Sequence, residues 1–403
     1  MKRIKEILTK EKKLTNINIA FISLMAMLLG VSIGNVITRS LSKTDTYNQI
    51  DVVYNKILNE YYKEITEKDL QTAAVKGMMS LLTDKHSEYL TKEQTEAFDQ
   101  LLDGSFDGIG VEITKNNDNK VEVVSIFENS PAAKAGIKKG DILLKINETD
   151  IKDKSLDEVV SLIKNKKKSI KIIVERDKKE KEFKIVPNSV DIPSVSSEVI
   201  ENNNQKIGYI RLSIFAANSD KQFEDAYNKL KNKKITKLII DLRDNVGGHL
   251  TTVNNITELF LGKDVPMYQI KKNKQKTVYY AKSGKNSKDE IVILINSNSA
   301  SAAELLSSAL REQLKATIVG TTSYGKGTVQ QAMTLKDGSM IKYTTEEWLT
   351  SKGKTINEKG ITPDVEIKLQ DKYYESYDKK DDNQLSKAIE LLTKDKWLSF
   401  FYV

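Results

Sequence analysis

The alternation of apolar and polar positions divides the chain into segments of different character. Residues 17–37 carry no charge over a length that can span a bilayer as a helix, whereas basic residues dominate 1–16. From 45 to 102 the apolar positions recur at helical spacing, which predicts amphipathic helices. These helices have little core of their own, so we expect them to pack on a neighbour or on a second subunit. One of their apolar faces is formed by Ile50, Val53, Ile57 and Tyr61.

The rest of the chain predicts two folded parts and a short tail. Residues 103–188 alternate like a compact β-rich module, with a helix expected over 156–163 and a strand over 169–176. Over 189–370 apolar strand-like runs alternate with helical patterns, which predicts an α/β core with helices against a largely parallel sheet. The last segment, 371–403, contains another amphipathic helix, expected over 384–398.

Charge and composition exclude several classes of function. The formal net charge of the 403 residues is +8, but Lys, Asp and Glu are mixed throughout, without an aromatic-basic cluster or zinc-finger spacing. We therefore expect no nucleic-acid partner, and a solvated basic surface near anionic lipid accounts better for the charge. The chain has no cysteine, which excludes disulfides and thiol chemistry.

The charge-free run 17–37 predicts a retained signal anchor. Its basic flank should stay in the cytoplasm, and no small-x-small cleavage site is evident near 30–38. We expect a single-pass protein of the cell membrane, with 1–16 in the cytoplasm and the body of the chain on the extracytoplasmic side. A buried helix of a soluble domain is the alternative, which the charged residues on both sides of the run disfavour.

The stretch 291–330 carries the candidate chemistry. A buried strand over 291–295 leads through a turn to Ser301, after which a helical pattern begins. Ser301 and Glu304 have the spacing of a capping box, in which the hydroxyl and the carboxylate close the helix N-terminus. The same position would place the Ser301 hydroxyl among unpaired amides at the positive end of the helix dipole, where an oxyanion can be stabilised. Capping and nucleophilic catalysis are compatible at this position.

A serine nucleophile needs a base, and the chain has only two histidines. His86 lies in a polar turn far upstream and His249 follows a Gly-Gly pair at a helix start, so each is interpreted as an ordinary surface or capping residue. Lys326 is the alternative base, because a lysine kept out of water can accept a proton near neutral pH. It lies between two glycines at the end of a predicted strand, where the backbone can approach its neighbours closely.

Residues 320–326 also fit G-x-x-x-x-G-K, the loop that cradles phosphates. The next residue is Gly327 instead of the Ser or Thr that would hold magnesium, and 328–335 reads as an extended run instead of a helix. Nucleotide binding is therefore disfavoured, and we expect neither a cofactor nor a metal ion.

Three separate motifs then carry a resemblance: Asp-Leu-Arg-Asp-Asn-Val-Gly-Gly at 241–248, Ser-Ala-Ser-Ala-Ala-Glu at 299–304 and Tyr-Gly-Lys-Gly-Thr-Val-Gln at 324–330. In this order they resemble the signatures of the carboxyl-terminal processing peptidases, also called tail-specific proteases. The resemblance implies that Ser301 is the nucleophile, Lys326 the base and Gln330 the third catalytic residue. Some members have an Asp eleven residues after the Ser, where this chain has Glu312, to which we assign no role. Oxyanion donors are implied at the amides of Ala302 and of Gly247 or Gly248.

The module over 103–188 resembles a PDZ domain. The resemblance implies that backbone amides of one turn receive the carboxylate of a peptide tail while a strand edge pairs with that tail. A third glycine and a following helix are missing, which disfavours a dinucleotide loop, and a small β-fold without a ligand is the remaining alternative. Arg176, at the end of the last strand, is a candidate for relaying peptide binding to the catalytic region. The tail-binding turn comprises Gly108, Ile109, Gly110 and Val111.

The sequence thus predicts a multidomain α+β protein with an N-terminal transmembrane helix, a helical segment, a PDZ-like β domain and an α/β peptidase core. The predicted function is a membrane-anchored Ser–Lys endopeptidase that cleaves proteins near their C-terminal tails, with the PDZ domain selecting or sensing the tail and gating activity. The family resemblance also implies a homodimer formed through the helical segment. The alternative is an inert PDZ scaffold with a peptidase-like core, and the retention of Ser301, Lys326 and Gln330 together argues against it.

Overall fold

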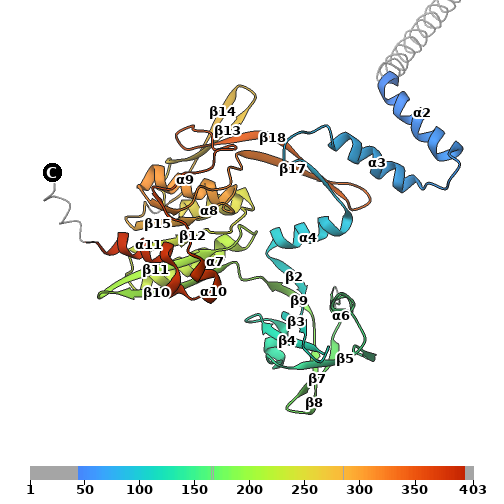
Figure 1. The fold of residues 1–403 in the computed structure, drawn as a ribbon, viewed down its shortest axis with the longest axis horizontal. Helices are drawn as coiled ribbons and strands as arrows, with labels where there is room; N and C mark the ends of the chain where they lie inside the picture. Colours follow the sequence, from blue (N-terminus) through green and yellow to red (C-terminus); the bar gives the residue numbers. More distant parts are fainter. Residues whose placement is uncertain (1–43, 165, 167, 285, 395–403) are drawn as a thin grey trace, which may run out of the picture. The chain divides into compact units, whose positions relative to one another are not determined.

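A computed structural model of the chain describes residues 44–164, 166, 168–284 and 286–394 (Figure 1). The basic segment 1–16 and the expected membrane span 17–37 lie outside the described residues. None of the helices in the described ranges is long and apolar enough to cross a membrane. The chain divides into two compact units, Met1–Thr83 and Asp84–Val403.

The described part of the first unit consists of helices α2 (Thr44–Glu60) and α3 (Glu67–Met79). Thr66 begins α3 with a capping box, in which its hydroxyl accepts the Asp69 amide (3.1 Å) and the Asp69 carboxylate accepts the Thr66 amide (3.3 Å). The predicted apolar face is left open to solvent, because the side chains of Ile50, Val53, Ile57 and Tyr61 are all exposed. Helices α2 and α3 confirm the expected helical pattern. The neighbour or second subunit that would cover this apolar face stays a prediction.

The second unit contains the β-rich module as a six-stranded antiparallel sheet, with five strands in the order β3-β4-β5-β7-β8 and β6 (Thr149–Asp150) paired to β5. Helices α5 (Pro131–Ala135) and α6 (Leu156–Ile163) accompany it. Its core is formed by alternating strand residues and by α6, for example Val123, Ile172 and Val159, all fully buried. The sheet strands are β3 (Val111–Lys115), β4 (Val121–Ile126), β5 (Ile142–Ile146), β7 (Ile170–Arg176) and β8 (Lys179–Ile185).

A short antiparallel ribbon of β2 (Ser105–Gly108) and β9 (Asn188–Asp191) links this module to the α/β core. The core sheet has the order β10-β11-β12-β15-β16-β19 and is parallel from β11 onward, as predicted. Its strands are β10 (Val195–Asn202), β11 (Gln205–Leu212), β12 (Lys237–Asp241), β15 (Glu290–Ile295), β16 (Thr317–Gly320) and β19 (Val365–Glu366).

Helices cover both faces of the core sheet (Figure 1). The strand residues alternate, so Ile240, Ile293 and Ile318 pack against α7 (Ser219–Asn232), α8 (Leu250–Glu258) and α9 (Ala302–Leu314). The intervening residues Ile239, Val292 and Val319 pack against α11 (Asn383–Thr393). The C-terminal segment also contains α10 (Asp371–Ser376) and the 3₁₀ turn η1 (Lys379–Asp381).

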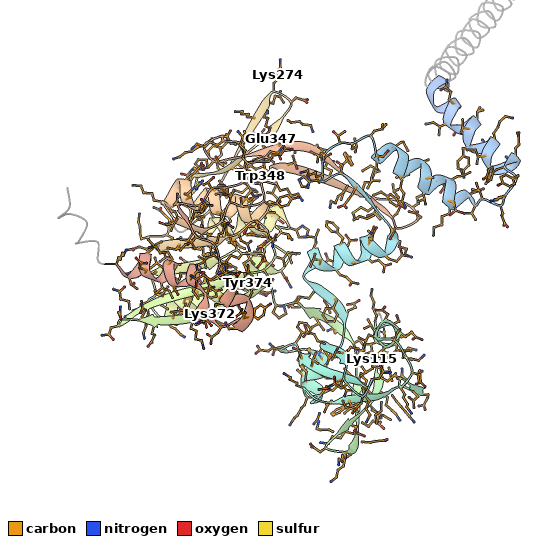
Figure 2. All side chains as sticks on the ribbon, viewed as in Figure 1. Lys115, Lys274, Glu347, Trp348, Lys372 and Tyr374 are labelled. Carbon is orange, nitrogen blue, oxygen red and sulfur yellow. The ribbon has the colours of Figure 1, made fainter. Side chains whose placement is uncertain are left out.

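A second, antiparallel sheet is built on the long strand β18 (Met340–Thr350), which pairs with β13 (Pro266–Lys272), β17 (Thr328–Thr334) and β1 (Glu88–Leu90). Strand β14 (Gln275–Tyr280) completes the β13 hairpin, with Lys274 at its tip (Figure 2). The prediction that 45–102 is helical throughout is wrong at β1, which precedes α4 (Lys92–Asp103). The reason is that Glu88 pairs with Lys342, 254 positions further along the chain, and helical periodicity cannot report such a pairing.

Candidate active site

Ser301 is held in an unusual backbone conformation where strand β15 passes into helix α9. Its φ of 54° and ψ of −115° lie in a region that residues with a side chain rarely adopt. Ala300, just before it, donates its amide to the Asn245 carbonyl (2.9 Å), which ties this turn to the loop after β12. Such strain persists only where neighbouring contacts fix the backbone, and it is common at catalytic nucleophiles.

Glu304 fixes the turn of Ser301 to the loop of Lys326. Its Oε2 accepts the amides of Ser301 (2.8 Å) and Lys326 (3.0 Å). Its Oε1 accepts the Ser323 hydroxyl (2.6 Å) and the Gly325 amide (2.7 Å). The residue is buried, and burial raises the pKa of its carboxyl while these four hydrogen bonds oppose the rise. The predicted return bond from Glu304 to the helix N-terminus is therefore present, and the same carboxylate also binds the segment 323–326, which includes the start of the third motif.

Lys326 follows β16 in a loop that the glycines on either side allow to pack tightly. A Cβ on Gly325 would stand 2.8 Å from the Gly360 amide nitrogen, and one on Gly327 would stand 2.6 Å from that of Asn357. Burial lowers the pKa of the Lys326 amine, and the charge of Lys342 lowers it further. The structure thus buries this amine and disfavours its charged form, and its role as the base stays a prediction.

The Gly-Gly turn lies directly against Ser301. A Cβ on Gly247, where φ is +102°, would stand 2.8 Å from the Ser301 Cβ, and one on Gly248 would stand 2.2 Å from the Phe215 carbonyl oxygen. The Gly247 amide donates to the Asn245 side chain (2.9 Å). An oxyanion that used this amide would therefore have to displace Asn245, which favours the Gly248 amide as the donor from this turn.

A buried ion cluster fixes the start of the same loop. Arg243 contacts Asp241 at the end of β12 (2.6 Å) and Asp382 just before α11 (2.8 Å). Burial alone would raise the pKa of Asp241, but the charge and hydrogen bonds of Arg243, the charge of Arg211 and the Tyr209 hydroxyl together lower that pKa. The helix on one face of the sheet is thereby bound to the loop that reaches the candidate nucleophile.

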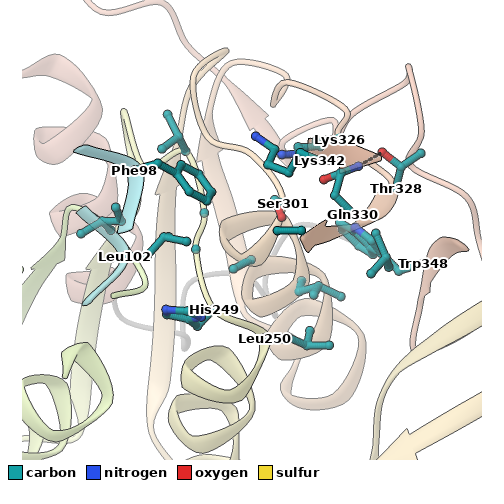
Figure 3. A pocket seen from close by; sticks show the side chains of 18 of the residues that line it. Phe98, Leu102, His249, Leu250, Ser301, Lys326, Thr328, Gln330, Lys342 and Trp348 are labelled. Atoms are coloured by element: carbon teal, nitrogen blue, oxygen red, sulfur yellow. Dashed lines mark hydrogen bonds between the residues drawn. The ribbon is translucent and has the colours of Figure 1, made fainter. Parts of the chain in front are cut away.

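These residues surround one cavity of about 470 Å³, drawn in Figure 3. Ser301, Lys326, Gln330, Ala302 and both turn glycines line it, so the structure brings together all the predicted core residues of the site. Most of the remaining wall is apolar and comes from α4, α8, α9, β17, β18 and the segment after β11. This part of the lining includes Leu102, Ile214, Leu250, Leu305, Val329 and Trp348.

The chain matches three sequence families over consecutive regions. Residues 32–94 match the N-terminal domain of the activating protease CtpB, 101–175 match the PDZ domain, and 206–367 match peptidase family S41. The carboxy-terminal processing protease CtpB of Bacillus subtilis is 37% identical over 328 residues, which cover 80% of this chain and 68% of that protein. The chain belongs to peptidase family S41.

Two further proteins are similar to this S41 chain. A probable CtpA-like serine protease of Staphylococcus aureus is 38% identical over 333 residues, covering 81% of this chain. The chain spans 66% of the length of that relative. A solved structure described as the photosystem II D1 C-terminal processing protease is 24% identical, with a TM-score of 0.48, over 84% of this chain and 90% of the other.

Gln330 of the S41 core connects the cavity to an upstream segment to which the sequence motifs assign no role. Its side-chain amide donates to the hydroxyls of Thr328 (2.8 Å) and Thr344 (3.2 Å). The Thr344 hydroxyl in turn donates to Asp84 (2.7 Å), and Ser87 accepts the Thr344 amide (3.0 Å). The expected orienting of Lys326 by Gln330 stays a prediction, while Asp84 and Thr344 are new members of the site's supporting network.

His86, interpreted as a surface or capping residue, lies close to the loop of Lys326. Its ring is half-buried with its centroid 6.1 Å from that of Tyr324, two residues before Lys326. Burial lowers the pKa of His86, and the charge of Lys326 adds to this. His249 precedes α8 as expected, but it also lines the cavity, and its Nε2 is buried without a partner among the described residues. The sequence gave no signal for the placement of His86, whereas His249 directly follows the predicted Gly-Gly turn.

The predicted tail-binding turn lies between β2 and β3 of the PDZ domain. Gly108 ends β2, Ile109 is buried, Gly110 has φ +80°, and Val111 begins β3. Strand β3 is the end strand of its sheet, which is the position that an added peptide strand requires. The binding of a tail here stays a prediction.

The candidate Arg176 and the unassigned Glu312 have contacts outside the cavity. Arg176 donates to both carboxylate oxygens of Asp141 (2.6 and 2.7 Å) and to the Gly136 carbonyl (2.8 Å) within the PDZ domain, and its relay role stays a prediction. Glu312 accepts the Ser351 hydroxyl and the Lys352 amide.

The loop 320–326 leads into strand β17, so it lacks the helix that a phosphate-cradling loop opens. The described residues contain no group of three or more His, Asp or Glu placed to hold a metal ion.

Proposed function

We propose that this chain is a serine endopeptidase of the Ser–Lys type that cleaves polypeptides near their C-terminal tails. The observation that carries the proposal is the shared cavity of Ser301, in its strained turn, and Lys326, whose amine has a pKa lowered by burial. A lysine amine whose charged form is disfavoured by burial, in the same cavity as a serine hydroxyl at a helix N-terminus, is a combination that can activate a serine without histidine.

The proposed reaction follows from these positions. The Ser301 hydroxyl attacks the scissile carbonyl while its proton passes to the Lys326 amine. The amides of Ala302 and of the Gly-Gly turn, Gly248 in particular, stabilise the oxyanion. The Lys326 ammonium then protonates the leaving amine, which breaks the peptide bond and leaves an acyl-serine. Water attacks this ester with Lys326 as base, and the serine is restored. Gln330, on strand β17 shortly after Lys326, orients the lysine amine for these proton transfers.

The cavity and the PDZ domain support a substrate class. Apolar side chains such as Leu250, Leu305 and Trp348 line the wall near Ser301, so an apolar residue next to the scissile bond is favoured. The free edge of β3 and the amides of 108–111 would hold the chain end. The Bacillus subtilis relative is named as a carboxy-terminal processing protease, which agrees with tail cleavage. Arg176 would relay tail binding to the core.

Anchoring and assembly are proposed on separate grounds. The charge-free run 17–37 behind a basic segment supports a single-pass anchor in the cell membrane, with the catalytic body on the extracytoplasmic side. The exposed apolar residues of α2 and α3 support a homodimer through the N-terminal helices. Chemical crosslinking of the full chain in membranes tests the dimer, and protease protection of intact cells tests the orientation.

The activity is tested with purified full chain and a folded substrate that carries an unstructured, apolar C-terminal tail. Mass spectrometry of the products should show cleavage within the tail by the unaltered chain and none by Ser301→Ala or Lys326→Ala. Circular dichroism of both variants checks that they remain folded. Cleavage that persists in either folded variant would refute the Ser–Lys assignment. Tail binding without cleavage by the unaltered chain would favour the inert scaffold.

A further inference from the structure

Lys342 is a second lysine at the cavity of Ser301 and Lys326, on a different strand. It lies on β18 and lines the cavity, with 14% of its side chain exposed (Figure 3). None of the three sequence motifs includes it. The Lys342 ammonium thus lies at the same cavity as Lys326, whose amine must be uncharged to accept the Ser301 proton.

Two contacts fix the Lys342 ammonium in place. It stands 2.5 Å from the Glu88 carboxylate and 4.7 Å from the ring centroid of Phe98. Glu88 is directly opposite Lys342 in the β1–β18 register, and Phe98 belongs to α4. The Glu88 side chain is 49% exposed, so water screens its charge and the pair does not fully cancel the field of the ammonium toward the cavity.

The charged and titratable groups near Lys326 come from four elements. Lys342 belongs to β18 and Glu88 to β1, and Glu304 approaches from α9. His86, flanked by Asp84 and Lys85, approaches from the turn before β1. Lys342 lowers the pKa of Lys326, whereas Glu88 and Glu304 raise it. Glu304 accepts four hydrogen bonds, and burial lowers the pKa of His86, which favours its neutral form. Lys342 and Glu88 therefore shift the pKa of Lys326 in opposite directions, and substituting each of them alone distinguishes the two effects.

We propose that Lys342, fixed by Glu88 and Phe98 at the wall of the cavity that Ser301 and Lys326 share, is a positioning residue whose ammonium sets the lowest pH at which Ser301 is activated. This rests on the proposed function in assigning Lys326 as the base. Glu88 acts in the opposite sense, because its carboxylate screens Lys342. The consequence is that β1, immediately after the N-terminal helices, contributes directly to the state of the catalytic base.

The proposal predicts opposite pH shifts for two substitutions. Lys342→Met removes the charge but keeps an apolar stem against Phe98, and it should move the acid limb of kcat/KM to higher pH by about one unit. At pH values below this limb, kcat/KM should be about tenfold lower than that of the unaltered chain, and at pH values above it the two should be equal. Lys342→Arg should restore the profile, and Glu88→Gln should move the limb to lower pH. The profiles are measured from about pH 5 to about pH 10, which spans perturbed and ordinary lysines.

Lys271→Met is the matched control. Lys271 forms a cross-strand pair with Glu347 (2.8 Å) in the same sheet but does not line the cavity, so its loss should leave the acid limb in place. An equal loss of activity at every pH in Lys342→Met would overturn the proposal, because it would indicate a structural role. A shift of Glu88→Gln in the same direction as Lys342→Met would overturn it as well.

A second readout does not depend on proteolysis. Trace acetylation of the full chain at a series of pH values, followed by peptide mass spectrometry, measures the reactivity of the Lys326 amine and hence its titration midpoint. The midpoint should rise in Lys342→Met and fall in Glu88→Gln. If the chain cleaves no substrate but these midpoints shift, the proposed function fails and the electrostatic role of Lys342 stands. If the chain cleaves tails and the midpoints do not move, the role of Lys342 fails alone.

Discussion

The backbone amides of Ser301 and Lys326 donate to the same carboxylate oxygen, Oε2 of Glu304, at 2.8 and 3.0 Å. The candidate nucleophile and base are therefore held in register by one buried side chain instead of by contact between their own functional groups. The other oxygen, Oε1, accepts the Ser323 hydroxyl and the Gly325 amide. The carboxylate thus accepts four hydrogen bonds, one from the start of helix α9 and three from the segment 323–326. An acceptor-only group is required at this point.

We expect Glu304→Gln to impair both activity and stability. The glutamine side chain has the same shape, but its NH₂ would take the place of an oxygen that accepts two hydrogen bonds. Because the segments of Ser301 and Lys326 would then shift, kcat/KM should fall about 100-fold. The free energy of unfolding should fall by about 1–3 kcal/mol because buried donors lose their acceptor. Steady-state kinetics and urea unfolding measure the two effects. Glu312→Gln, which alters a hydrogen-bonded carboxylate on the same helix outside the cavity, should spare activity; full activity of Glu304→Gln would contradict the bracing role.

Lys326→Met should abolish activity while it stabilises the fold at neutral pH. The folded-state pKa of this amine lies below its ordinary value of 10.5, so burial of the charged form penalises folding. That penalty is full below the folded pKa and is relieved as the pH rises toward the unfolded value, because the unfolded chain binds more protons in that window. The substitution should add on the order of 1 kcal/mol near neutral pH and less near pH 10. Urea unfolding at both pH values measures this, and a uniform destabilisation would contradict it.

Gly247→Ala should displace the nucleophile. The new Cβ would meet the Ser301 Cβ at 2.8 Å and the Ala300 carbonyl at 2.9 Å, in addition to the strain of φ +102°. We expect a loss of about 100-fold or more in kcat/KM. Gly140→Ala is the control, since Gly140 has φ +87° and an added methyl group would meet open space within 4 Å. Both should lose about 1–3 kcal/mol of stability from backbone strain, but only Gly247→Ala should lose activity.

Thr344→Val should lower kcat through Gln330. The substitution keeps the shape of the side chain but removes the hydroxyl that links Gln330 to Asp84. We expect a five- to tenfold decrease in kcat, about the worth of one hydrogen bond of about 1 kcal/mol. The adjacent Thr345 has a buried hydroxyl without a partner in the described part of the chain, so Thr345→Val should be neutral or stabilising. Equal kinetics for the two variants would show that the link to Asp84 is not used.

Local pattern predicted much of the fold. The helix expected over 156–163 is α6 with the same bounds, and the capping relation of Ser301 and Glu304 follows from their spacing. Such features depend on neighbours in the chain, which periodicity reports directly. Strand β1 escaped prediction because its three residues gain their hydrogen bonds only from β18, far along the chain.

The amino-acid sequence by itself singled out the candidate residues: a serine at a helix start, a lysine between glycines and a Gly-Gly turn, each within its own short motif. The tertiary structure alone decided what surrounds them. It brought Glu88, His86 and Lys342 close to Lys326, and it gave Glu304 its contacts with the Lys326 loop. The physical reason is that burial and charge at a site depend on segments that meet only when the sheets close, and no local spacing encodes which segments those are.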